Sequence, residues 1–394
     1  MSPRDAALQA LLDKGVRIPN PASVDIAEDV DVDRISGDGV TLHNGTRLRG
    51  ASTVVSAGCT LGAETPVTVE SSQLGPNVAL KGGYVSKAVF LEGANMGSGA
   101  HVREGSILEE EANGAHTVGL KQTILFPFVT LGSLINFCDC LMSGGTSRSD
   151  HSEVGSSYIH FNFTPDGNKT TASLFGDVPR GVMLDQPPIF LGGQGGAVGP
   201  VYTGFGTVVG AGSILRSDVM DDGMLVTVDD PPGKVRPAAK HSYRRLGRII
   251  ARNLTYVGSL DALEAWYRGV RQPFFAAQEL GGLVYEGALA ALASARAERL
   301  KRVKALVAHL EDGDDGRGQL RERIDDVLAL FGTPEVAVPD ALAGGLGPSE
   351  GGYLAAIRGL SGEARSAGTA WLQGIVDDRL DRAAGLVPAL ELGR

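Results

Sequence analysis

The chain has 394 residues and a formal net charge of −10, with 43% hydrophobic and 21% charged residues. This composition is typical of an ordered globular protein, and the negative charge argues against a surface devoted to nucleic acid. No apolar run approaches the roughly 18 residues of a membrane-spanning helix, and the first residues lack a basic-then-apolar secretion signal. Three cysteines are too few for a disulfide framework. We therefore expect a cytoplasmic protein without membrane or nucleic-acid partners.

Residues 1–22 are expected to form a short helical segment, and residues 23–235 carry a repeat. Aliphatic residues recur six apart, as in Leu42, Leu48 and Val54. Six residues match one face of a triangular coil in which one aliphatic side chain per face points inward and stacks on the next coil. Small residues or positive φ at the corners would account for the 55 glycines. The sequence thus predicts a left-handed parallel β-helix of hexapeptide repeats; a β-sandwich, whose strands should alternate with period two, is the alternative.

Two stretches break the six-residue register, at about 140–152 and 161–188. We interpret both as loops inserted into the β-helix, because segments that leave a rigid scaffold commonly carry function. The alternative is that they are tolerated surface insertions.

The last part of the chain, residues 236–394, has a different amino-acid composition. It follows a turn signal at 229–233 and is rich in Ala, Leu and Arg. Apolar residues at three-and-four spacing predict helices over 241–268 and about 274–310. Because the arginines alternate with acids, we expect a solvated helical cap or oligomerisation module.

Three strings within residues 100–219 carry a family resemblance: AHVREGSILEEEANGAHTVGLKQ (100–122), HFNFTPDGNK (160–169) and VYTGFGTVVGAGSILRSDV (201–219). They resemble the acetyltransferase domain of the bifunctional bacterial enzymes that acetylate glucosamine 1-phosphate and then make UDP-N-acetylglucosamine. The nucleotidyltransferase domain of that family has no counterpart here, since no LxxGxGTRM-like loop occurs. This chain is therefore not expected to make UDP-sugars itself.

The resemblance implies a set of site residues. Arg103 and Lys121 fall on the positions that hold the sugar phosphate, and an Arg–Lys clamp suits a dianion. The loop residues Asn162, Asp166 and Lys169 match the family, whereas Phe163 replaces a tyrosine. The closing coils would receive acetyl-CoA, and the residues expected to bind it are Gly206, Gly210, Gly212 and Arg216.

The sequence departs from the family at the general base. The family motif GHLTY corresponds here to residues 132–136, so that Ser133 replaces the histidine and Asn136, which we keep as a substrate-binding residue, replaces the tyrosine. Serine is a poor base for an amine that must lose a proton. Among the seven histidines, His160 is the preferred substitute because it adjoins the Asn162 loop, and His151 is second.

Two other patterns have weaker interpretations. The GGQGG run at 192–196 lacks the strand–loop–helix context of a phosphate-binding loop, and we interpret it as a corner of the coil or a close contact between subunits. Cys138, Asp139, Cys140 and His151 could be drawn as a metal site, but their spacing does not fit structural zinc, so no metal is expected.

These observations predict a homotrimer with sites between neighbouring coils. The expected activity is acyl transfer from acetyl-CoA to an amino sugar phosphate or a nucleotide sugar. The alternative is a non-catalytic protein that binds a sugar phosphate or nucleotide sugar as a sensor or scaffold, and a third possibility is a purely structural trimer.

Overall fold

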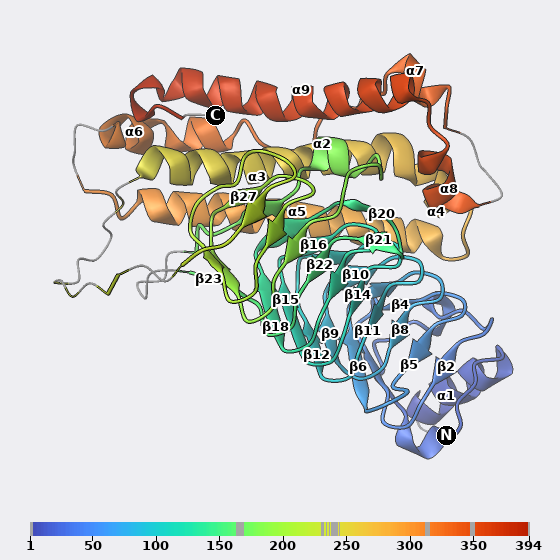
Figure 1. The fold of residues 1–394 in the computed structure, drawn as a ribbon. Coiled ribbons are helices and arrows are strands. Elements are labelled where there is room, and N and C mark those ends of the chain that lie inside the picture. Colours follow the sequence, from blue (N-terminus) through green and yellow to red (C-terminus); the bar gives the residue numbers. More distant parts are fainter. Residues whose placement is uncertain are drawn as a thin grey trace.

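The computed structural model describes residues 3–162, 169–229, 232, 233, 235, 237, 243, 245–311, 316–346 and 351–392. It consists of a parallel β-helix of about 11 turns and a C-terminal helical region (Figure 1). The predicted fold class is therefore confirmed. No helix in the described part of the chain is long and apolar enough to cross a membrane.

Each coil of the β-helix contributes short strands to three parallel sheets, which we call A, B and C. Sheet A contains β2 (Thr41–Leu42), β5 (Thr60–Leu61), β8 (Ala79–Leu80), β11 (Asn95–Met96), β14 (Asn113–Gly114), β17 (Thr130–Leu131), β22 (Glu153–Val154), β25 (Phe190–Leu191), β28 (Val208–Val209) and β30 (Leu225–Val226). Sheet B contains β1 (Asp25–Ile26), β3 (Arg47–Arg49), β6 (Val67–Glu70), β9 (Gly83–Ser86), β12 (Ala100–Val102), β15 (Val118–Lys121), β18 (Ile135–Cys138), β23 (Ile159–Phe161), β26 (Gly196–Val198) and β29 (Ile214–Leu215). Sheet C contains β4 (Val54–Val55), β7 (Gln73–Leu74), β10 (Ala88–Phe90), β13 (Ser106–Leu108), β16 (Ile124–Leu125), β19 (Cys140–Met142), β24 (Ser173–Phe175) and β27 (Tyr202–Thr203).

The six-residue period of the sequence corresponds to the step from one face of the β-helix to the next. Leu42 lies on sheet A, Leu48 on sheet B and Val54 on sheet C, and all three are fully buried. Along sheet A, Leu42 pairs with Leu61, which in turn pairs with Leu80. Each coil thus buries its aliphatic side chains only by stacking on its neighbours.

The corners explain only part of the glycine content. Gly83 has φ +119°, and a Cβ atom there would lie 2.1 Å from the Ala100 carbonyl oxygen, so glycine is required. At other corners, however, side chains adopt the left-handed region: Lys87, Gln122 and Asp139 have φ of 50°, 53° and 60°. Of these side chains, Lys87 is exposed and Asp139 partly exposed, whereas Gln122 is buried.

The two predicted insertions differ in structure. The first contains an antiparallel hairpin of β20 (Gly145–Ser147) and β21 (Asp150–His151). The second is interrupted by β24, because the apolar Leu174 and Phe175 return to sheet C and pair with β19. The short helix α2 (Val178–Gly181) follows, capped by the Asp177 side chain. Part of the predicted second loop, 163–168, lies outside the described residues.

The helical region packs directly on the β-helix. The helices of the described chain are α1 (Pro3–Asp13), α3 (Leu246–Trp266), a π-helical turn η3 (Tyr267–Arg271), α4 (Gln272–Ala276), α5 (Gly281–Val307), α6 (Arg317–Leu328), α7 (Asp340–Ala343), α8 (Gly352–Arg358), α9 (Gly362–Leu386) and the 3₁₀ turns η1 (Pro21–Ser23), η2 (Val32–Arg34) and η4 (Pro388–Leu390). Helices α3, α5 and α9 lie side by side, with α5 against β7, β10 and β13 and α3 against β24 (Figure 1). A single hydrophobic cluster runs from the coils into these helices. Sheet C is thus covered by the chain's own helices.

Candidate functional site

The two cations expected to hold phosphate lie on neighbouring coils at one end of sheet B. Val102 of β12 pairs with Leu120 of β15, and the Arg103 amide donates a hydrogen bond to the Leu120 carbonyl (2.9 Å). Arg103 therefore lies beside Lys121, at the strand spacing of about 4.8 Å. Lys121 in turn pairs with Cys138 of β18. The structure brings Arg103 and Lys121 together where strands turn from sheet B to sheet C.

An acidic neighbour partly neutralises this pair. The Lys121 ammonium lies 2.7 Å from the Glu104 carboxylate. Partial burial alone would raise the pKa of Glu104. The hydrogen bond and charge of Lys121, a backbone hydrogen bond and the Arg103 charge together outweigh it and hold that pKa below its usual value. Burial raises the pKa of the Cys138 thiol to about 11, opposed by the nearby Arg103 guanidinium. A dianionic ligand would compete with Glu104 for Lys121.

A bare stretch of backbone adjoins the cations on the outward face of sheet B. Pairing places His101, Gly119 and Asn136 in one row across β12, β15 and β18. His101 and Asn136 are exposed, and Gly119 between them carries no side chain. A Cβ atom at Gly119 would meet no atom closer than the Ile135 carbonyl oxygen at 3.8 Å. Open space therefore lies over Gly119, two residues from Lys121 on the same strand.

A histidine and a serine face each other at the opposite end of the same strands. His116 and Ser133 precede β15 and β18 by two residues each, and His116 Nδ1 lies 2.9 Å from Ser133 Oγ. The Ser133 amide donates to Ser156 Oγ (3.1 Å), which fixes the Ser133 backbone. Ser133 occupies the position of the family histidine. The exposed imidazole of His116 therefore lies next to that position, one coil away.

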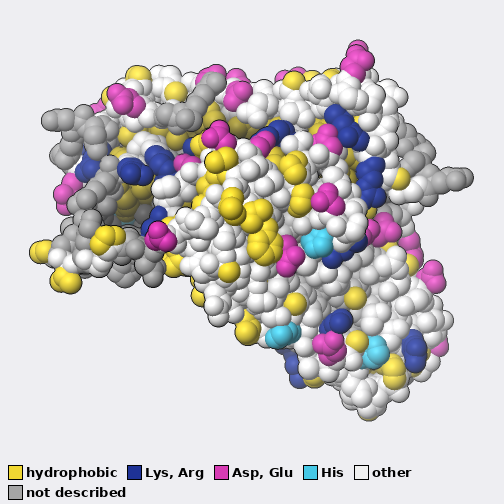
Figure 2. All heavy atoms as spheres, in the orientation of Figure 1, with side chains coloured by type: hydrophobic (Ala, Val, Ile, Leu, Met, Phe, Trp, Pro, Cys, Tyr) yellow, Lys and Arg dark blue, Asp and Glu magenta, His cyan; other side chains and the backbone are white. Residues whose placement is uncertain are grey.

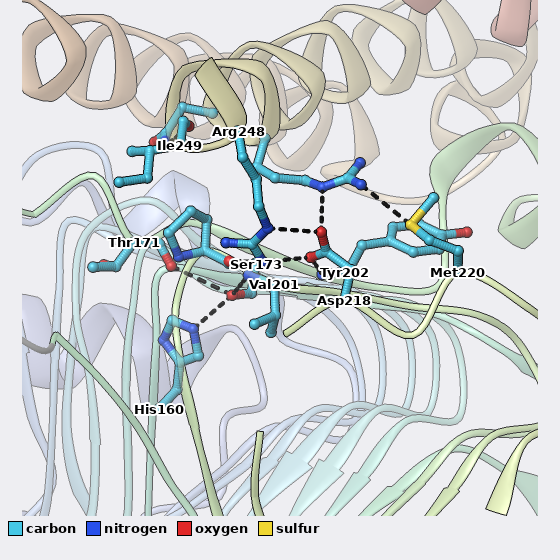
Figure 3. Close-up of polar contacts among 12 residues, drawn as sticks. His160, Thr171, Ser173, Val201, Tyr202, Asp218, Met220, Arg248 and Ile249 are labelled. Atoms are coloured by element: carbon cyan, nitrogen blue, oxygen red, sulfur yellow. Dashed lines mark hydrogen bonds and ion pairs between the residues drawn. The ribbon is translucent and has the colours of Figure 1, made fainter. Parts of the chain in front are cut away.

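His160, the preferred base, lies in the interior. Its Nε2 is 2.8 Å from Ser173 Oγ, which also accepts a hydrogen bond from the Val201 amide (Figure 3). Burial lowers the pKa of His160 to about 4, although a backbone hydrogen bond at Cys138 opposes the shift. The imidazole is therefore neutral near pH 7. Its hydrogen bond to Ser173 connects β23 to β24, which indicates a structural role.

His151, the second candidate, lies on another edge of the coil. It belongs to the hairpin between sheets C and A, whereas Arg103 and Lys121 mark the turn from sheet B to sheet C. Its ring is partly exposed, and its Nδ1 atom is buried without a hydrogen-bond partner among the described residues. The structure does not bring His151 together with the two cations.

The loop after β23 lies near an arginine that the sequence did not single out. Asn162 is half-buried, Lys169 is exposed, and Phe163 and Asp166 lie outside the described residues. The buried Arg299 of α5 reaches the Lys169 carbonyl (3.4 Å) and forms a 2.7 Å ion pair with Asp139. No local pattern marks Arg299, because its partner lies 160 positions earlier in the chain.

The residues expected to bind acetyl-CoA lie on the late coils. Gly206 and Gly212 occupy corners with φ of +69° and +75°. Arg216 is exposed and follows β29, which is five strands beyond β12 in sheet B. That separation is about 24 Å at normal strand spacing, so Arg216 is remote from Arg103. Gly210 lies one coil below Thr227. A Cβ atom at Gly210 would lie 3.2 Å from the Thr227 side chain.

The described residues contain no group of three or more His, Cys, Asp or Glu side chains that could hold a metal ion. Cys138 and Cys140 are free thiols on neighbouring strands of sheets B and C.

Comparison with known proteins confirms the resemblance read from the sequence. No family model matches the chain. It is 26% identical over 212 residues to Bifunctional protein GlmU of Thermotoga sp. (strain RQ2), which covers 54% of this chain and 42% of the relative. The proteins of the same name from Carboxydothermus hydrogenoformans (26% over 218 residues, 55% and 43%) and Trichlorobacter lovleyi (29% over 220 residues, 56% and 42%) match similarly. The chain therefore corresponds to less than half the length of these relatives.

Proposed function

We propose that the protein transfers an acetyl group from acetyl-CoA to an amino sugar phosphate or a nucleotide sugar. The observation that carries this proposal is the stacking of Arg103 on Lys121 beside the bare backbone of Gly119. Two cations on a rigid scaffold are a fitting clamp for a phosphate dianion. The similarity to Bifunctional protein GlmU supports the same class of substrate.

In this proposal the sugar lies over Gly119, between His101 and Asn136. Arg103 and Lys121 hold its phosphate, and Lys121 exchanges Glu104 for the ligand. Asn162 and Lys169 border the sugar, and Phe163 and Asp166 are assigned to the same loop by the resemblance. Acetyl-CoA is long, so its nucleotide end can lie by Arg216 on the late coils, with Gly206, Gly210 and Gly212 at the adjoining corners, while its thioester reaches the sugar.

The chemical step joins the sugar nitrogen to the acetyl carbon and breaks the carbon–sulfur bond of acetyl-CoA. The amine loses one proton and the departing coenzyme A thiolate gains one. The sequence favoured His160 or His151 as the base, but His160 is buried against Ser173 and His151 lies on another edge of the coil. We assign the proton transfer to His116, acting directly or through Ser133, because this imidazole is exposed and adjoins the outward face that holds Gly119.

We propose a homotrimer in which the late coils meet. Phe190, Val208 and Leu225 pair across sheet A and remain 39%, 42% and 74% exposed. Hydrophobic side chains gather over the late coils on the face in Figure 2. An exposed apolar row of this kind is typical of an interface. Val208→Lys should convert a trimer to monomers in native mass spectrometry; a wild-type monomer would refute this assembly.

The replacement of the family histidine by Ser133 favours a second candidate, a protein that binds sugar phosphate without turnover. The same experiment separates the two. Binding of glucosamine 1-phosphate and of a UDP-amino sugar is measured calorimetrically, and release of free coenzyme A is followed with a thiol reagent. Arg103→Ala and Lys121→Ala should each weaken binding at least tenfold, Glu104→Gln should strengthen it, and Arg47→Ala on β3 should leave it unchanged. Binding with thiol release supports the transferase, binding alone supports the second candidate, and no binding refutes both.

A further inference from the structure

A large cavity lies at one end of the helical region, where the β-helix contributes Glu92 to the described wall, away from the site on sheet B. Its volume is about 770 Å³, within the range of small-molecule sites. The described wall combines η3 and α4 with residues in or near α7 and α8, namely Val338, Ala343, Leu346, Gly352 and Tyr353, and Glu92 of a coil corner lies at one side. Figure 1 shows α4 and α8 together at this end of the helical layer. Most of the lining is apolar, including Phe274, Ala277 and Leu346.

One side of the cavity has an excess of negative charge. A smaller neighbouring cavity shares Glu92, Phe274 and Tyr353 with it and adds Glu110 and Arg271. Arg271 forms ion pairs with Glu109 (3.2 Å) and Glu110, yet among the described residues Glu110 Oε2 and the Nε and Nη1 atoms of Arg271 are buried without a hydrogen-bond partner. Such an orphaned carboxylate oxygen is costly unless a donor satisfies it.

The remaining carboxylate, Glu92, lies at the cavity without an opposing cation in the described wall. Glu92 is exposed to solvent on one side. Partial loss of water around its carboxylate, followed by the negative charges of Glu110 and Glu111, raises its pKa above the usual value. A bound cation would relieve both effects, whereas an anion would add to the repulsion.

The aromatic wall already accommodates one cation. The Arg271 guanidinium carbon lies 3.9 Å from the Tyr353 ring centroid, and Phe274 packs edge-on against that ring at 5.6 Å. Aromatic faces stabilise cations from which water has been removed. The cavity thus combines an apolar body, aromatic rings and an unbalanced carboxylate.

We propose that this cavity binds a small molecule with an apolar body and one ammonium group, the ammonium facing Glu92 and the apolar body lying against Phe274 and Leu346. The site does not depend on acyl transfer, because it lies between α4 and α8 rather than on the outward face of sheet B.

The test compares three eight-carbon probes on the full chain by calorimetry: octylammonium, octanol and octanoate. Octylammonium should bind with one-to-one stoichiometry, at least fivefold more tightly than octanol, and octanoate should not bind. Glu92→Gln should weaken octylammonium at least fivefold and leave octanol unchanged, whereas Glu28→Gln, on an early coil, should change neither.

A pair of tryptophan variants locates the binding. Ala277 and Ala293 are both exposed, and Ala277 alone belongs to the cavity wall. Ala277→Trp should abolish octylammonium binding, and Ala293→Trp should preserve it. Equal affinity for the three probes, no binding of octylammonium, or unchanged binding in Ala277→Trp would each overturn the proposal. Unchanged thermal melting of the unliganded Ala277→Trp variant shows that the fold is intact.

Discussion

His116 Nδ1 and Ser133 Oγ lie 2.9 Å apart on adjacent coils of the β-helix. Hydrogen bonding to an imidazole makes a serine hydroxyl better able to relay a proton than an isolated one. The pair lies at the corner between sheets A and B. His116 and Lys121 lie at opposite ends of β15, and Gly119 lies between them. A titratable group is therefore available at the place where the sequence alone shows only a serine.

If this pair moves the proton, His116→Ala should lower kcat for acetyl transfer about 100-fold or more, since general-base catalysis contributes about 10²–10⁴-fold. Ser133→Ala should have a smaller effect, because His116 could still act through water. Steady-state kinetics with glucosamine 1-phosphate test both variants, and His43→Ala on an early coil is the matched control. Full activity in His116→Ala would rule the pair out.

The open space over Gly119 allows a steric test of the substrate position. Because a Cβ atom there meets nothing closer than 3.8 Å and φ is not positive, Gly119→Phe should fold normally. Its ring should occupy the place of the sugar and weaken glucosamine 1-phosphate binding at least tenfold in calorimetry. Gly374→Phe, at another open position, should bind as the wild type does. Normal binding by Gly119→Phe would show that the sugar does not lie over Gly119.

The ion pair between the buried Arg299 and the mostly buried Asp139 joins helix α5 to the B–C corner. Arg299→Leu leaves the Asp139 carboxylate buried without its partner, which should lower the free energy of unfolding by about 3 kcal/mol. Adding Asp139→Asn should restore much of that loss in urea denaturation. Arg302→Leu, which removes a more exposed pair with Glu298 one turn along the same helix, should cost less than about 1 kcal/mol. Equal losses in the two arginine variants would contradict this account.

His160 makes the fold sensitive to acid. Its pKa in the folded protein is about 4, below the ordinary value of 6.5, so between these limits the unfolded chain binds a proton that the folded chain does not. Stability should therefore fall as the pH drops from 6.5 to 4, by up to about 3 kcal/mol from this group.

Urea unfolding at pH 7 and pH 4.5 measures this contribution. His160→Gln cannot take up the proton, so its stability should fall less between the two pH values than that of the wild type. His43→Gln should retain the wild-type pH dependence. An unchanged pH dependence in His160→Gln would show that the buried imidazole does not titrate in this way.

The sequence by itself determined the β-helix and the stacking of Arg103 on Lys121. Both depend on local information: the six-residue period sets which side chains point inward, and the family resemblance identifies cations whose strands the coil then places about 4.8 Å apart. The sequence also indicated helices after residue 236, because three-and-four spacing is visible within a single segment.

Only the tertiary structure decided which groups from distant segments meet. It placed Arg299 against Asp139, covered sheet C with α3 and α5, and enclosed the cavity that Glu92 and Phe274 share. It also showed that His160 is buried whereas His116 is exposed, although neither lies in a pattern that distinguishes them. A sequence period records which way a side chain points from its own coil, but burial and ion pairing depend on the element that packs on top, and that element comes here from more than 100 residues away.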